Sequence, residues 1–179
     1  MKRHVAATLL GVLGFLIIDG HVDWVQQDNR TLLEVSGQRF DPKGWMAEHW
    51  RQLQRDCSPV HNDLANPTTA TAVLHVIQQH SLPDSLEAKL LQLHRQTDWA
   101  IAEVVFKTLN PSIVVLHQAQ GDWRIQENAV WSGSTAPWLA ADFVRRYLQQ
   151  QVPELPRALL SCVPIEGSRY AATATGPWL

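Results

Sequence analysis

Two cysteines, Cys57 and Cys162, are the side chains best suited to covalent chemistry in this 179-residue chain. A cysteine thiolate is a nucleophile when an imidazole lies within reach, and His117 follows Cys57 by sixty residues. In an oxidising compartment, however, an even pair of cysteines in a small domain is most simply one disulfide bond. We favour a Cys57–Cys162 disulfide, with two buried free thiols or one reactive thiol as the alternatives.

The sequence around Cys57 gives the reactive thiol a specific form. Asp56-Cys57-Ser58 resembles the Asp-Cys-Ser-Gly motif of the NlpC/P60 cysteine peptidases of cell-wall turnover. The resemblance implies a cell-wall hydrolase with Cys57 as the nucleophile and His117 as the base. It covers three residues only, since Pro59 stands in place of the glycine and Cys57 falls at the end of an expected helix. We keep the hydrolase as an alternative to the disulfide.

Trp131 and Trp138 bracket a polar segment, residues 132–137, that follows an expected hairpin. Loops on rigid scaffolds often carry binding sites, so two exposed indole rings here would indicate a binding module for cell-wall sugar or peptide. The competing interpretation, which we favour, is that both rings are buried where the hairpin meets the next helix.

Metal, cofactor and nucleic-acid partners have no support in the sequence. No His-Glu-x-x-His pair and no Cys-x-x-Cys is present, so we predict neither a metal site nor a cofactor. The formal net charge of −2 gives no electrostatic reason to expect nucleic acid as a partner.

The first twenty residues indicate where the protein works. Lys2 and Arg3 precede an uncharged apolar run at residues 5–18, a length typical of a secretory signal, whereas a membrane span needs about 20 residues. Gly20 offers only a poor cleavage site, so residues 1–20 are either a signal peptide or an uncleaved anchor that holds the chain to the membrane through residues 5–18. Both alternatives place the rest of the chain in the periplasm or outside the cell.

The part after the signal is long enough for one ordinary domain, which we place at residues 21–170. Residues 171–179 are small and polar except for Trp178 near their end, and we expect them to form a flexible tail.

Helical spacing and caps predict several helices. Asp41 and Pro42 suit the cap and first residue of one helix, which we expect to turn Met46, Trp50, Leu53 and Cys57 toward the core. A second helix starts at Thr68 or Thr69. A third starts near Ser85 with Leu86, Leu90 and Leu93 inward, and residues 98–109 continue it as a helix or, less favoured, form a strand. A later helix carries Leu139, Phe143, Val144, Tyr147 and Leu148 on one side.

Strand signals predict a small antiparallel sheet. Residues 112–118 and 123–131 form a hairpin around Gly121, and Trp123, Ile125, Ala129 and Trp131 alternate as if they shared one face. Residues 31–35 predict another strand with a turn at Gly37, and residues 159–163 a short strand or turn. The expected fold is therefore α+β, with helices packed on an antiparallel sheet.

An export signal without a competent active site favours a non-enzymatic envelope protein. We expect a periplasmic or membrane-tethered protein whose partners are other envelope proteins, for example an accessory subunit of a secretion or conjugation machine. The alternatives are the hydrolase that uses Cys57 and the binding module that uses the loop between Trp131 and Trp138.

Overall fold

The computed structural model describes residues 22–171, and these residues fold into helices and two antiparallel sheets. The predicted α+β class is confirmed. The chain divides between Leu53 and Gln54 into two compact units, which we call the first and the second unit. The signal or anchor expected at residues 1–20, and the expected tail beyond Ala171, lie outside the described residues.

The first unit begins with a three-stranded meander in the order β1-β2-β3. Its strands are β1 (Val22–Gln27), β2 (Arg30–Val35) and β3 (Gln38–Phe40). Asp28 and Asn29 join the first two with positive φ angles of 52° and 61°, as a two-residue hairpin turn requires. The strand expected at residues 31–35 and the turn at Gly37 are confirmed.

Helix α2 (Pro42–Gln54) follows the meander and starts at the predicted cap. Asp41 accepts a hydrogen bond from the Gly44 backbone N–H through Oδ1 at 2.8 Å, and its Oδ2 pairs with Arg30 of β2 at 2.6 Å. The expectation that this helix faces the core is wrong, because none of its residues is buried. Met46, Trp50 and Leu53 are 60%, 64% and 81% exposed.

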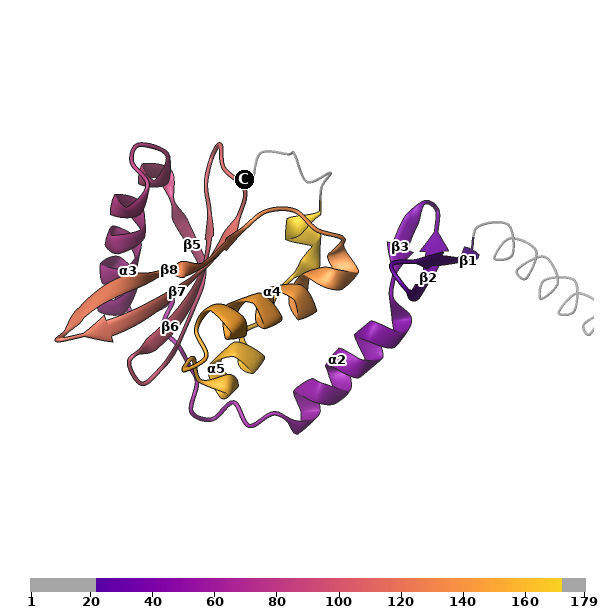
Figure 1. Cartoon of the computed structure of the whole chain (residues 1–179), viewed down its shortest axis with the longest axis horizontal. Helices are drawn as coiled ribbons and strands as arrows, with labels where there is room; N and C mark the ends of the chain where they lie inside the picture. Colours follow the sequence, from indigo (N-terminus) through magenta and orange to yellow (C-terminus); the bar gives the residue numbers. More distant parts are fainter. Residues whose placement is uncertain (1–21, 172–179) are drawn as a thin grey trace, which may run out of the picture. The chain divides into compact units, whose positions relative to one another are not determined.

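The second unit is built on a five-stranded antiparallel sheet in the order β4-β5-β6-β7-β8. Its strands are β4 (His61–Asn62), β5 (Lys89–Gln96), β6 (Trp99–Val105), β7 (Ser112–Ala119) and β8 (Asp122–Ser132). Helix α3 (Pro67–His80) covers one face of the sheet, and α4 (Pro137–Gln151) and α5 (Arg157–Cys162) cover the other (Figure 1). Each face therefore has its own apolar core.

The prediction of a third helix is wrong, because its residues form the strands β5 and β6. Only the short 3-10 helix η1 (Asp84–Glu87) forms near Ser85, and residues 89–105 are a hairpin. Strand β6 is buried on both faces: Ala100, Ala102 and Val104 join the core under α3, while Ile101 joins the core under α4. A strand covered on both sides is a continuous apolar run without period-two alternation, and such a run is easily read as helix.

The hairpin of β7 and β8 is confirmed, with a tight turn at Gln120 and Gly121 whose φ angles are 56° and 94°. The shared face predicted for β8 is wrong. Trp123 lies in the core under α3, whereas Ala129 and Trp131 lie in the core under α4. The pairing shifts between Leu116↔Ile125 and Val114↔Val130, and this bulge of β8 turns the following side chains to the other face.

The C-terminal elements complete the core under α4. The expected helix is confirmed as α4, whose Ala140, Val144 and Leu148 are buried. The segment expected to be a strand or turn at 159–163 forms most of α5, and the 3-10 helix η2 (Gly167–Tyr170) follows it.

Among residues 22–171, no helix is long and apolar enough to cross a membrane.

Candidate functional site

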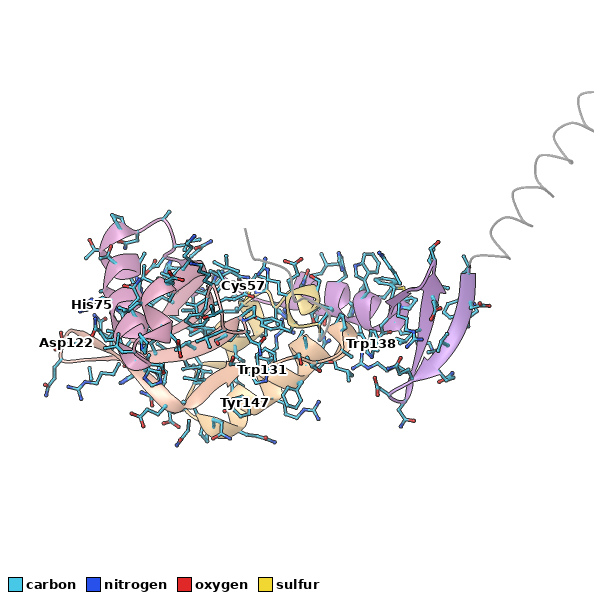
Figure 2. The ribbon with its side chains drawn as sticks, turned by 90° about the horizontal axis from the view of Figure 1, so that it is seen from above. Cys57, His75, Asp122, Trp131, Trp138 and Tyr147 are labelled. Atoms are coloured by element: carbon cyan, nitrogen blue, oxygen red, sulfur yellow. A yellow bond between two sulfur atoms is a disulfide. The ribbon has the colours of Figure 1, made fainter. Side chains whose placement is uncertain are left out.

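The disulfide between Cys57 and Cys162 is present, as the sequence predicted, with the two Cα atoms 5.8 Å apart. It joins the loop after α2 to the end of α5, so it ties the start of the second unit to its last α-helix (Figure 2). Neither cysteine of the chain has a free thiol. The bond points to an oxidising, extracytoplasmic compartment. It also leaves Cys57 without the thiolate that the hydrolase alternative requires.

His117 is held by groups other than Cys57. Its Nε2 lies 2.9 Å from Asp98 Oδ2, and its ring lies 4.4 Å from the indole of Trp99. The pKa of the Asp98 carboxyl is lowered first by the hydrogen bond from Thr97 and then by His117. This cluster closes the turn between β5 and β6 against β7, which is a structural role.

Trp131 and Trp138 do not form an exposed aromatic rim. Trp131 is 8% exposed and contacts Tyr170 edge-on with the ring centroids 4.7 Å apart. Trp138 is partly buried at the start of α4, and Figure 2 shows both positions. A ligand therefore has no access to the Trp131 ring, which belongs to the core.

A polar cluster that the sequence did not predict surrounds Glu103 in the core of the second unit. The Glu103 carboxylate is 2% exposed and accepts hydrogen bonds from Tyr170, Arg169 and Gln92, each at 2.6 Å. Burial and the Glu103 charge raise the pKa of Tyr170. For Arg169, burial alone would lower the pKa, but the hydrogen bond to Glu103 and its negative charge have the larger combined effect. The pKa of Arg169 is therefore raised. The signal in the sequence was a single acidic residue within the apolar strand β6.

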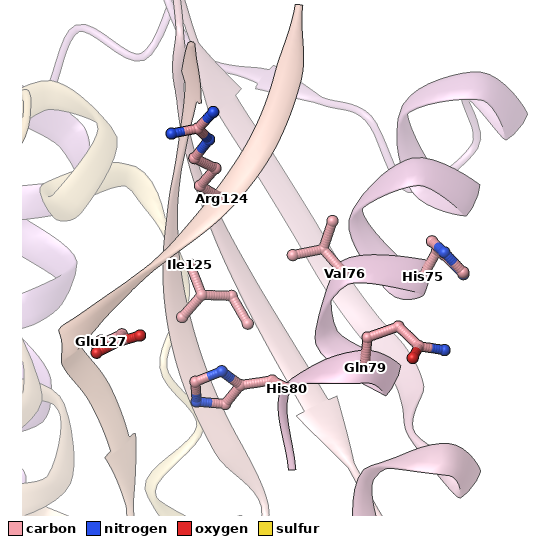
Figure 3. Close-up of a pocket in the computed structure, with 7 residues that line it drawn as sticks. All are labelled: His75, Val76, Gln79, His80, Arg124, Ile125 and Glu127. Carbon is pink, nitrogen blue, oxygen red and sulfur yellow. The ribbon is translucent and has the colours of Figure 1, made fainter. Parts of the chain in front are cut away.

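An open groove of about 500 Å³ lies between α3 and β8 (Figure 3). Val76 and Ile125 form its apolar floor, and its rim carries His75, His80, Arg124 and Glu127. The described residues contain no group of three or more acidic, histidine or cysteine side chains arranged to hold a metal ion.

The first unit presents the most unusual surface. Seven of the twelve large apolar side chains that are exposed in the described chain belong to it, namely Trp24, Val35, Phe40, Trp45, Met46, Trp50 and Leu53. Large exposed apolar patches are rare on monomeric proteins and mark interaction sites, and two of these side chains, Phe40 and Trp45, are in contact. Figure 1 shows α2, the helix that carries four of these side chains, following the meander.

One stripe of α2 concentrates this exposure. At about 100° per residue, Trp45, Met46, His49, Trp50 and Leu53 occupy an arc of about 140°, and we call these five residues the apolar face of α2. The rings of Trp45 and His49 are tilted by 38° with centroids 4.2 Å apart, and the ring centroids of Phe40 and Trp45 lie 6.3 Å apart. The formal charges of the helix lie outside this arc, and two of them, Glu48 and Arg51, pair with each other at 3.1 Å.

Comparison with known proteins finds no relative: no family model matches the chain, and no curated protein and no solved structure is significantly similar to it. The fold and the surface define an α+β protein that has a disulfide-bonded second unit and a helix with exposed apolar side chains.

Proposed function

We propose that this chain is a non-enzymatic protein of an extracytoplasmic compartment that works through protein–protein contacts. Its contact surface is the apolar face of α2. The observation that carries the proposal is that α2 buries none of its residues while Trp45, Met46, Trp50 and Leu53 are each more than half exposed. An accessory subunit of an envelope machine, exported or tethered by residues 1–20, fits this description.

The composition of the surface supports a protein partner. Tryptophan is among the residues that contribute most to binding at protein interfaces, and its ring loses little conformational entropy on burial. The apolar face of α2 carries Trp45 and Trp50 beside Met46, which adapts to irregular partner surfaces. Burying apolar area is worth about 25 cal/mol per Å², so covering such a face favours association.

The second unit supplies the support against the hydrolase alternative. The Cys57–Cys162 bond leaves no thiol for nucleophilic attack, and His117 is engaged by Asp98 and Trp99. The unit has the properties of a rigid scaffold with two apolar cores and a disulfide.

Site-specific photo-crosslinking in the source cells tests the proposal. A photo-reactive amino acid placed at Trp50 or Leu53 reports what covers the apolar face of α2, and the same probe at Arg51, about 170° from the centre of this face, reports the opposite side of the helix as the matched control. We expect protein adducts of defined mass from positions 50 and 53 and none from position 51. Equal adducts from both faces, or adducts only to lipid, would contradict a protein contact at this face.

A further inference from the structure

We infer that the apolar face of α2 is covered by α2 of a second copy of this chain, with the two helices antiparallel about a two-fold axis between His49 and Trp50. This inference rests on the proposed function, because it names the partner of the same surface.

The apolar face of α2 keeps its spacing when the direction of the helix is reversed. Its central residues are Met46, His49, Trp50 and Leu53, with spacings of three, one and three residues. Reversing the direction of the helix places Met46 opposite Leu53 and His49 opposite Trp50. A two-fold interface uses the same surface on both copies, so it needs a surface that is complementary to itself in this way. Flexible apolar side chains then meet at the ends, and aromatic rings meet at the centre.

The charges of α2 are also compatible with a second copy. No formally charged side chain lies within the apolar face of α2, so two copies can cover it without taking an unpaired charge out of water. The rest of the helix carries two basic side chains, Lys43 and Arg51, and one acidic side chain, Glu48. This balance differs from the excess of basic residues that is typical of helices lying on a membrane surface. A second protein surface suits this helix better than a lipid surface.

The apolar face of α2 has about the area that a weak dimer needs. The exposed fractions of Trp45, Met46, Trp50 and Leu53 range from 52% to 81%. With about 150–250 Å² for a large aromatic side chain, these fractions correspond to roughly 500 Å² on each copy. The total of about 1,000 Å² is at the lower limit for a specific interface, so the expected dimer is weak and reversible.

Cysteine crosslinking in the full chain, with the native Cys57–Cys162 bond intact, tests both the dimer and its direction. The variants are His49→Cys, the double variant Met46→Cys/Leu53→Cys, each of its single variants, and Arg51→Cys on the opposite side of the helix as the control. On non-reducing gels after mild oxidation we expect a dimer from His49→Cys and from the double variant. The single variants at 46 and 53 and the control should remain monomeric.

Several outcomes overturn the inference. A dimer from Met46→Cys alone would mean parallel helices, and a monomer from every variant would mean that no second copy is present. The photo-crosslinks then separate the two proposals: adducts of position 50 to a different protein leave the proposed function standing, whereas the absence of any protein adduct removes both. A second readout is the mass in solution, where Trp50→Glu should convert the dimer to a monomer whose far-ultraviolet circular dichroism is unchanged.

Discussion

The Tyr170 hydroxyl donates a hydrogen bond of 2.6 Å to Oε1 of Glu103, a carboxylate that lies 67 residues earlier in the centre of the sheet. Tyr170 is 1% and Glu103 2% exposed, so the bond lies within the protein core. Arg169 donates to the other oxygen, Oε2, at 2.6 Å. Through these contacts β6 holds the 3-10 helix η2, and with it the end of the described chain, against the second unit.

Replacing Glu103 should therefore destabilise the second unit. Glu103→Gln removes the buried carboxylate charge that accepts from Arg169 and Tyr170. Arg169 is 26% exposed and keeps Glu166 as a partner, so we expect a loss of about 1.5–3 kcal/mol, the range for hydrogen bonds to a charged group. Tyr170→Phe removes one hydrogen bond and should cost about 1–2 kcal/mol. Urea unfolding followed by circular dichroism measures both changes.

The matched control for this cluster is Glu166→Gln. Glu166 also pairs with Arg169 at 2.6 Å, but its side chain is 58% exposed. Exposed ion pairs contribute about 0–1 kcal/mol, so this variant should stay close to the parent protein. Equal losses from Glu103→Gln and Glu166→Gln would show that burial of the Glu103 carboxylate does not set the strength of the cluster.

The disulfide should account for a large part of the stability of the second unit. Cys57 and Cys162 are 105 positions apart, and a loop of about that length is worth about 4–5 kcal/mol in the chain-entropy model. The double variant Cys57→Ser/Cys162→Ser should lower the free energy of unfolding toward this amount. Thiol titration in denaturant should detect no thiol before reduction and both cysteines after it, and a thiol that titrates without reductant would refute the bond.

Acid should weaken the start of α2 through Asp41. Burial raises the pKa of Asp41, but the Gly44 N–H and Arg30 outweigh it, so the folded pKa lies below the ordinary 3.8. The unfolded chain therefore takes up the proton first as pH falls. The stabilisation is complete above pH 3.8 and is lost as the pH drops from there through the folded pKa.

Two variants separate the charge of Asp41 from its capping role. Asp41→Asn keeps a side chain that caps helices well and loses the ion pair with Arg30, whereas Asp41→Ala loses both and should cost about 1 kcal/mol more. Hydrogen exchange of the α2 amides at pH 6 and pH 3 measures the effect. The protection lost in Asp41→Asn at pH 6 should shrink at pH 3, and a difference that is independent of pH would exclude the charge.

Local sequence signals predicted the parts of the fold that neighbouring residues decide. Asp41 and Pro42 mark the start of α2 because a cap needs only the N–H groups of the next turn. Gly121 marks the turn between β7 and β8 because its positive φ of 94° favours glycine. The disulfide was predicted from the signal or anchor expected at residues 1–20 together with an even number of cysteines.

The sequence predicted which residues share the apolar side of α2, but not that this side is exposed. Helical spacing showed that Met46, Trp50 and Leu53 share one side of a helix, but periodicity does not show what covers that side. The prediction assumed the core of the same domain, and the structure instead leaves these residues exposed in a first unit whose sheet buries little beyond Leu32.

The class of fold, the cap of α2, the β7–β8 turn and the pairing of Cys57 with Cys162 were predictable, because each depends on adjacent residues or on the count of cysteines. The three-dimensional structure was needed to show that residues 99–105 are a strand and that Trp123 and Trp131 face opposite cores. It was also needed to show that Glu103 is buried among Tyr170, Arg169 and Gln92, and that α2 buries none of its residues. Each of these features depends on which elements cover a given side chain, and that is set by contacts between residues far apart in the chain.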